Sequence, residues 1–198
     1  MRFDDACPIF NRLVSTLKNL AGESVVVVQL GTSSGREIRW LAKSFPNFRF
    51  CGTDIFEDAV KFAQSQDELP NLDFETCSAK ELGAKLEAYK ERRIVVFSSG
   101  SMQYVQPEHL DLLFREIKAS KKLLQLHLLE PGDETLETPN KILGSVPRGN
   151  FSYTHGYDYY AKQNGLTVKL SDIIRPYPGQ AALGKTIHYD FYCINQSD

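Results

Sequence analysis

A loop of small residues and a carboxylate further along the chain have the types and spacing of a nucleotide site. The loop follows the apolar run Val25–Val28 and consists of Gly31, Thr32, Ser33, Ser34 and Gly35. Glycines at such a turn let the backbone approach a ligand closely. Asp54 closes the next apolar run. A carboxylate there can accept hydrogen bonds from both hydroxyls of a ribose.

A second group of residues could move protons. The segment Phe151–Tyr160 is the densest aromatic run in the chain and contains His155 beside Gly156. Histidine has an unperturbed pKa near neutral pH, which suits a general base. Tyrosines suit the wall of a pocket that is apolar and also orients its ligand. We expect His155 to act as a base, although a structural or exposed histidine, and tyrosines buried in a helix, fit the sequence as well.

The loop and Asp54 must be positioned by a βαβ unit. A continuous apolar run that ends in a Gly-rich turn is typical of a strand buried on both faces of a parallel sheet. After the loop, Ile38, Leu41, Ala42 and Phe45 form one apolar helical stripe. Ligands of such sheets bind beyond the carboxyl ends of the strands. The sequence therefore predicts that residues 31–35 and Asp54 meet at one edge of the sheet.

Further strand patterns follow this unit to the end of the chain. Further strands are expected near residues 72–76, 94–97, 123–129, 166–175 and 186–194. The connection between the last two is too short for a crossover helix, so the last strand should be antiparallel to its partner. These patterns predict an α/β fold with a doubly wound, seven-stranded sheet that is mostly parallel, has an antiparallel last strand and carries helices on both faces.

We expect one domain over residues 1–198. Residues 1–23 should form a leader helix that packs on an α/β core of residues 24–198, and such a helix could also close over a cofactor. The segment 131–157 has no clear periodicity and is interrupted by Pro139, Gly144 and Pro147. A connection of this length is usually functional or mobile. It is our candidate for a substrate lid.

Composition narrows the possible partners. The net charge is −2 and no basic stripe is visible, which argues against nucleic acid. The four cysteines lie far apart, so neither a zinc site nor a disulfide framework is indicated. No apolar stretch reaches the length of a membrane span, and the amino terminus does not look like a signal peptide. We expect a cytoplasmic protein that binds small molecules, without a metal. The sequence does not indicate an oligomeric state.

Two motifs resemble those of class I S-adenosylmethionine-dependent methyltransferases. The segment Gln29–Gly35 is similar to their acid-x-Gly-x-Gly-x-Gly loop, and Gly52–Ile55 is similar to their second motif. The resemblance implies S-adenosylmethionine as cofactor and a Rossmann-like fold. The loop would pass along the methionine moiety, and Asp54, followed by Ile55, would hold the ribose. Gln29 stands in place of the usual acid, and Ser33 in place of the middle glycine.

The resemblance extends to two further turns. Ser78 and Ala79 follow the third strand where the family often has an acid-Ala pair beside the adenine, and a serine could equally be a helix N-cap there. Ser98, Ser99 and Gly100 resemble the family's fourth motif, which passes beneath the methionine part of the cofactor. His155 or Tyr104 would then face the methyl acceptor.

The sequence therefore predicts methyl transfer to a small-molecule acceptor, with oxygen preferred because a hydroxyl benefits from a nearby base. An alternative is a methyltransferase-like module that has lost its chemistry and serves as a binding or scaffold protein, as Gln29, Ser33 and Ser78 would suggest. An NAD-dependent enzyme is disfavoured, because the Gly-x-Gly-x-x-Gly fingerprint is missing and the chain ends in a hairpin.

Overall fold

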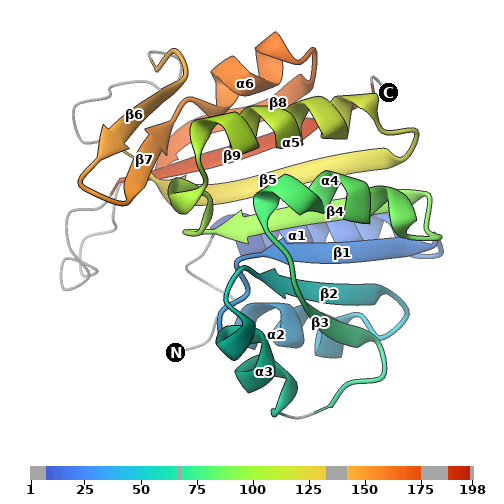
Figure 1. Cartoon of the computed structure of the whole chain (residues 1–198). Coiled ribbons are helices and arrows are strands. Elements are labelled where there is room, and N and C mark those ends of the chain that lie inside the picture. The colour runs from blue at the N-terminus through green and yellow to red at the C-terminus, as the bar shows by residue number, and fades with distance from the viewer. Residues whose placement is uncertain (1–7, 67, 133–141, 175–186, 197–198) are drawn as a thin grey trace.

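Helices cover both faces of a central sheet in the computed structural model, which describes residues 8–66, 68–132, 142–174 and 187–196 (Figure 1). The helices are α1 (Pro8–Asn19), α2 (Arg36–Ser44), α3 (Glu57–Gln64), α4 (Ala79–Ala88), the 3₁₀ helix η1 (Met102–Tyr104), α5 (Pro107–Ala119) and α6 (Tyr157–Gln163). The strands are β1 (Val25–Leu30), β2 (Arg49–Asp54), β3 (Leu72–Thr76), β4 (Arg93–Ser99), β5 (Leu123–Pro131), β6 (Ser145–Arg148), β7 (Ser152–His155), β8 (Thr167–Ile174) and β9 (His188–Ile194).

The central sheet has seven strands in the order β3-β2-β1-β4-β5-β9-β8. The strands from β1 to β5 pair in parallel, whereas β9 is antiparallel to both β5 and β8. The predicted seven-stranded sheet with an antiparallel last strand is therefore confirmed. The order reverses between β1 and β4, and such a switch point opens a crevice at the carboxyl ends of the strands.

Alternate residues of β1 enter two different cores. Val26, Val28 and Leu30 pack with apolar residues of α4, α5 and α6. Val25 and Val27 pack with residues of α1, α2 and α3 on the opposite face. This alternation follows from the period of two in a strand. It explains why the run Val25–Val28 in β1 is apolar without interruption, as a strand covered on both faces requires.

The leader helix is anchored to the far strands of the sheet. Arg12 of α1 forms an ion pair with Asp190 of β9 at 2.5 Å, and its Nε donates to Nδ1 of His127 on β5 at 3.1 Å. The His127 ring is fully buried and stacks on Tyr192. Burial, followed by the neighbouring charge of Arg12, lowers the pKa of His127 to about 3, so the ring is a neutral acceptor. These contacts hold α1 against the sheet.

The candidate lid contains a hairpin that the sequence analysis did not anticipate. Strands β6 and β7 form a separate two-stranded antiparallel sheet within the segment 131–157. Each strand of this hairpin has only four residues, and Pro147 and glycines lie in or beside the strands. The sequence therefore shows no clear alternation of apolar and polar residues there. Residues 133–141 lie outside the described part. The hairpin lies at the carboxyl end of the sheet (Figure 1), where β7 contacts η1.

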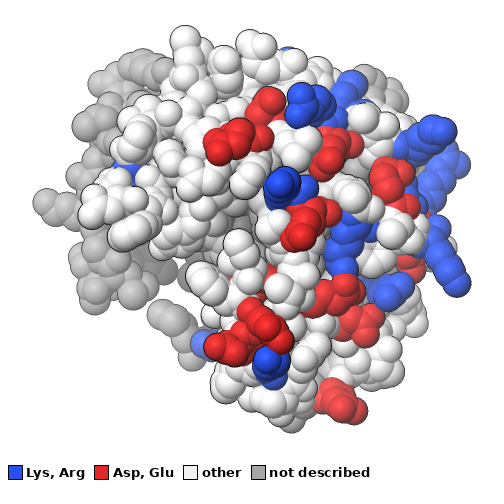
Figure 2. All heavy atoms as spheres, in the orientation of Figure 1, with Lys and Arg blue, Asp and Glu red and all other residues white. Residues whose placement is uncertain are grey.

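Charged side chains are unevenly spread over the surface. In Figure 2, lysines and arginines are interleaved with aspartates and glutamates toward the amino ends of the strands. The described surface around β6, β7 and η1 is mostly uncharged in the same view. Within the described ranges, no helix combines the length and apolar character needed to cross a bilayer.

Candidate cofactor and acceptor site

The loop between β1 and α2 has the backbone of a glycine-rich turn even where it carries a serine. Gly31 and Gly35 both have φ of 73°, and Ser33 has φ of 49°. Ser33 is the only described residue other than glycine in this left-handed region. The conformation costs an L-residue roughly 1–2 kcal/mol, which glycine avoids. Ser33 therefore adopts the left-handed backbone conformation that a glycine at this position would favour.

Gln29 takes part in the structure of this loop. Its side chain is buried and donates to Glu37 Oε2 at 2.7 Å, while its Oε1 accepts from Thr32 Oγ1 at 3.1 Å. Burial raises the pKa of Glu37, and the hydrogen bond from Gln29 acts in the opposite direction. An amide can donate and accept at once, which a carboxylate cannot. Gln29 thus links the loop to the first turn of α2.

The side chain of Asp54 accepts hydrogen bonds from two backbone N–H groups, one of which belongs to the loop. One carboxylate oxygen accepts from the Ser33 N–H at 2.8 Å, and the other accepts from the Phe56 N–H at 3.1 Å. The residue is 8% exposed and ends β2 at the same edge of the sheet as the loop. Each oxygen has a second lone pair, so the carboxylate can still accept from ribose hydroxyls. Ile55, which follows it, is largely exposed.

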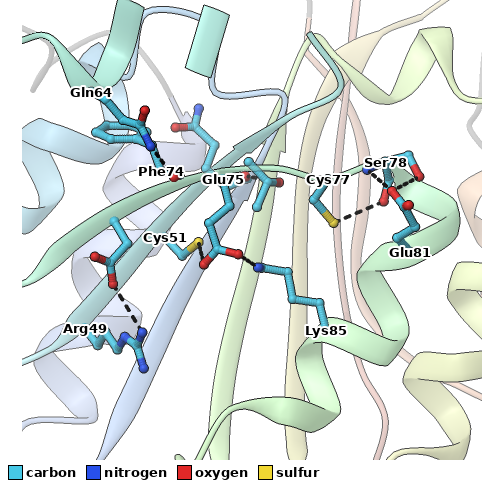
Figure 3. A network of polar contacts seen from close by, with 12 residues as sticks. Arg49, Cys51, Gln64, Phe74, Glu75, Cys77, Ser78, Glu81 and Lys85 are labelled. Atoms are coloured by element: carbon cyan, nitrogen blue, oxygen red, sulfur yellow. Dashed lines mark hydrogen bonds and ion pairs between the residues drawn. The ribbon is translucent and has the colours of Figure 1, made fainter. Parts of the chain in front are cut away.

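The turn after β3 carries Ser78 and Ala79. Ser78 donates to Glu81 Oε2 both from its hydroxyl, at 2.7 Å, and from its backbone N–H, at 3.0 Å. These contacts anchor the start of α4, as Figure 3 shows beside the Cys51–Glu75–Lys85 contacts. The Ser78 oxygen still has lone pairs that could accept from an adenine amino group. The N-cap role and the predicted cofactor role are therefore compatible.

The turn after β4 connects the loop to the end of β5. Gly100 has φ of 80°, and its N–H donates to the Leu129 carbonyl at 2.9 Å. Ser101 Oγ donates to the Gly31 carbonyl at 3.2 Å. A Cβ on Gly31 would lie 2.1 Å from Ser101 Oγ, so the two turns are in close contact. Ser99 is half-buried and Tyr104 on η1 is 61% exposed.

Ser98 points into the protein. Its hydroxyl is buried and donates to Glu130 Oε1 at 2.7 Å. Its predicted support of the reactive end of the cofactor is therefore indirect, through the turn that it begins. Glu130 itself was missed by the sequence analysis. A usable signal existed, because Glu130 lies near the end of β5, in a position comparable to that of Asp54 in β2.

His155 lies beneath the surface and both ring nitrogens have partners. The residue is 1% exposed, Nδ1 lies 2.6 Å from Ser145 Oγ, and Nε2 lies 3.1 Å from the Met102 carbonyl. A carbonyl only accepts, so we assign the ring proton to Nε2, which leaves Nδ1 to accept from Ser145. Burial lowers the pKa of His155 to about 4, so the ring is neutral at pH 7.

The contacts of His155 continue toward α6. Ser145 Oγ also lies 2.7 Å from the hydroxyl of Tyr160, which is buried. Because the Ser145 proton is directed to His155, Tyr160 donates to Ser145. Sequence reasoning treated Tyr160 as a pocket or core residue and did not identify Ser145 at all. A chain of hydrogen bonds therefore runs from Tyr160 through Ser145 to His155, and the base role of His155 stays a prediction.

The comparisons with known proteins fit this geometry. Residues 27–122 match a family model described as "Methyltransferase domain". No curated protein matches the chain. The matched residues run from within β1 to the residue before β5 and include all the predicted cofactor-binding residues.

Several solved structures have a similar fold. A SAM-dependent methyltransferase from Aquifex aeolicus is 14% identical, with a TM-score of 0.59 over 92% of this chain and 89% of that one. Magnesium protoporphyrin IX methyltransferase from Synechocystis, solved with bound SAM, is 13% identical, with a TM-score of 0.62 over 95% and 78%. An S-adenosylmethionine-dependent methyltransferase from Mesorhizobium loti is 12% identical, with a TM-score of 0.61 over 91% and 96%.

Proposed function

We propose that the protein transfers the methyl group of S-adenosylmethionine to a hydroxyl of a small molecule. The premise is that residues 27–122 match a methyltransferase domain and that the chain has the fold of solved methyltransferases. The observation that carries the proposal is the contact between Asp54 and the loop. Asp54 accepts from Ser33 and Phe56 N–H groups and keeps lone pairs for a ribose at the carboxyl edge of the sheet.

The residues present fit the cofactor. The loop keeps its left-handed turns at Gly31, Ser33 and Gly35, and there is no space for a side chain at Gly31. Asp54 would hold the ribose, Ser78 and Ala79 would flank the adenine, and the turn from Ser98 to Gly100 would lie beneath the methionine part. When bound, the cofactor supplies an electrophilic methyl group. The protein would contribute orientation and a dry pocket.

The acceptor would lie between η1 and the β6–β7 hairpin. Large apolar side chains are exposed there, and Tyr104, Val146 and Phe151 are each more than half exposed. Tyr153 Oη donates to Gln106 Oε1 at 2.8 Å, which ties the hairpin to the start of α5. This surface favours an acceptor with an apolar body. His155 would take up the acceptor proton through Ser145, which contacts its Nδ1 from the hairpin, and Tyr104 is the alternative residue.

Calorimetry with S-adenosylhomocysteine and with NAD⁺ is the first test. We expect binding of S-adenosylhomocysteine alone. A screen of hydroxylated compounds, scored by release of S-adenosylhomocysteine, should then find turnover among phenols and other apolar alcohols rather than among charged sugars. Binding of NAD⁺ without S-adenosylhomocysteine would refute the proposal.

A binding module without catalysis is the second candidate. The observation that favours it is the burial of His155, whose ring nitrogens are both occupied. Such a protein would bind S-adenosylhomocysteine and show no turnover in the screen. The same pair of measurements therefore separates the two candidates.

A further inference from the structure

Glu130 is a buried carboxyl group for which the proposed reaction has so far no use. It lies near the end of β5, opposite Tyr189 of β9, and none of its surface is exposed. A buried carboxylate is costly unless hydrogen bonds compensate it. The groups that donate hydrogen bonds to Glu130 therefore indicate its role in the structure.

The contacts of Glu130 converge on one segment, residues 98–104, which we name the acceptor turn. Ser98 Oγ donates to Glu130 Oε1 at 2.7 Å. The backbone N–H groups of Met102, Gln103 and Ser101 also favour the carboxylate form of Glu130. Oε2 has no hydrogen-bond partner among the described residues. Glu130 thus supports the acceptor turn from inside the protein.

Two further contacts hold the same turn. His155 Nε2 donates to the Met102 carbonyl at 3.1 Å, so η1 is held on its carbonyl side by β7 and on its amide side by β5. Ser101 Oγ donates to the Gly31 carbonyl at 3.2 Å. The acceptor turn is therefore connected to the cofactor loop, to the hairpin and to β5 at once.

We propose that Glu130 is a positioning residue for methyl transfer. Together with His155 it would fix the acceptor turn, and through Ser101 it would set the distance between the cofactor loop and the acceptor. It acts through the turn because its own side chain is buried. The inference rests on the proposed function.

The charge of Glu130 should matter near neutral pH. Burial raises its pKa to about 7, and the bond from Ser98 and the nearby amides oppose that rise. Tyr157 of α6 faces Glu130, Tyr189 of β9 lies opposite it, and Tyr157 also lies close to Tyr189. His155 reaches the same turn in its neutral form.

As pH rises through 7 the carboxyl group of Glu130 loses its proton, and a carboxylate accepts stronger hydrogen bonds than a neutral acid. The turn should be held more firmly at pH 8 than at pH 6.

Glu130→Gln tests this, with Glu116→Gln as the matched control. Glu116 on α5 also has a buried oxygen without a hydrogen-bond partner in the described part of the chain, but it packs beside Gly83 of α4 instead of the acceptor turn. The measurements are affinity for S-adenosylhomocysteine at pH 6 and pH 8 and hydrogen exchange of residues 98–105. We expect Glu130→Gln to bind about tenfold more weakly at pH 8, to lose the pH dependence of the parent and to exchange faster in the turn.

The outcomes distinguish a failure of the proposed role of Glu130 from a failure of the proposed function. If the parent binds S-adenosylhomocysteine and Glu130→Gln matches it in affinity at both pH values and in exchange, the role of Glu130 is refuted. If the parent itself does not bind, the proposed function fails first. Should Glu130→Gln not fold, Ser101→Ala removes the link to Gly31 without altering the buried site. Weaker binding and faster exchange in Ser101→Ala would support the inference, and parental values would overturn it.

Discussion

Replacing Asp54 by alanine should weaken cofactor binding at least tenfold. The structure gives two sources for this loss. The carboxylate would no longer accept from the ribose hydroxyls, and hydrogen bonds to a charged group are worth about 1.5–3 kcal/mol each. The Ser33 and Phe56 N–H groups would also lose their acceptor, so the loop would no longer be fixed before the cofactor arrives.

The same variant should be less stable. An N–H group left without a partner costs about 1–3 kcal/mol when buried, and Asp54 is 8% exposed. The neighbouring variant Asp73→Ala is the control. Asp73 lies on β3, its side chain is 57% exposed, and it pairs with Arg49 at the surface. Such a pair contributes about 0–1 kcal/mol, so Asp73→Ala should change little.

Calorimetry with S-adenosylhomocysteine and urea unfolding of both variants would decide the role of Asp54. A large loss of affinity that exceeds the loss of stability is the expected result. If Asp54→Ala unfolds more easily but binds S-adenosylhomocysteine with parental affinity, Asp54 holds the loop and nothing more. The assignment of the ribose site would then be wrong.

Substitutions centred on three other positions, Ser33, Gly31 and His155, test the remaining parts of the site. Ser33→Gly should tighten binding of S-adenosylhomocysteine, because it removes a left-handed serine that costs about 1–2 kcal/mol, and Ser33→Val should weaken it; equal affinities in calorimetry would contradict this. Gly31→Ala should abolish binding because its Cβ would meet Ser101, and adding Ser101→Gly should restore part of it; a double variant no better than the single one would show that the clash lies elsewhere. His155→Ala should lower turnover by about 10²–10⁴ with little change in cofactor affinity if the imidazole is the base; an unchanged rate would transfer the role to Tyr104.

The pH dependence of stability tests the burial of His155. Its folded pKa is lowered to about 4, whereas an unfolded chain would titrate near 6.5. The unfolded state therefore binds more protons in this interval, and the contribution of His155 should be lost as pH falls from about 6.5 to 4. Urea unfolding of the parent and of His155→Gln between pH 4.5 and 7 should show a smaller loss in the variant. His127 titrates in the same direction in both proteins and so cancels in the comparison.

The sequence by itself determined the sheet and the position of the loop from Gly31 to Gly35 at its carboxyl edge. The runs before Gly31 and Asp54 are local, and so are the small-residue loop from Gly31 to Gly35 and the apolar stripe of α2. These features depend on residues a few places apart, where strand and helix periods are directly visible. The short connection before β9 was enough to predict its antiparallel direction.

The tertiary structure alone decided which polar side chains face the edge and which are buried. His155 meets Met102 across 53 residues, and Ser98 meets Glu130 across 32. No local pattern encodes such contacts, because they depend on how β4, β5 and the hairpin come together. Burial then sets the pKa of His155 and of Glu130 in opposite directions, since it disfavours the charged form of each. The protonation states of His155 and Glu130 are therefore properties of the folded chain.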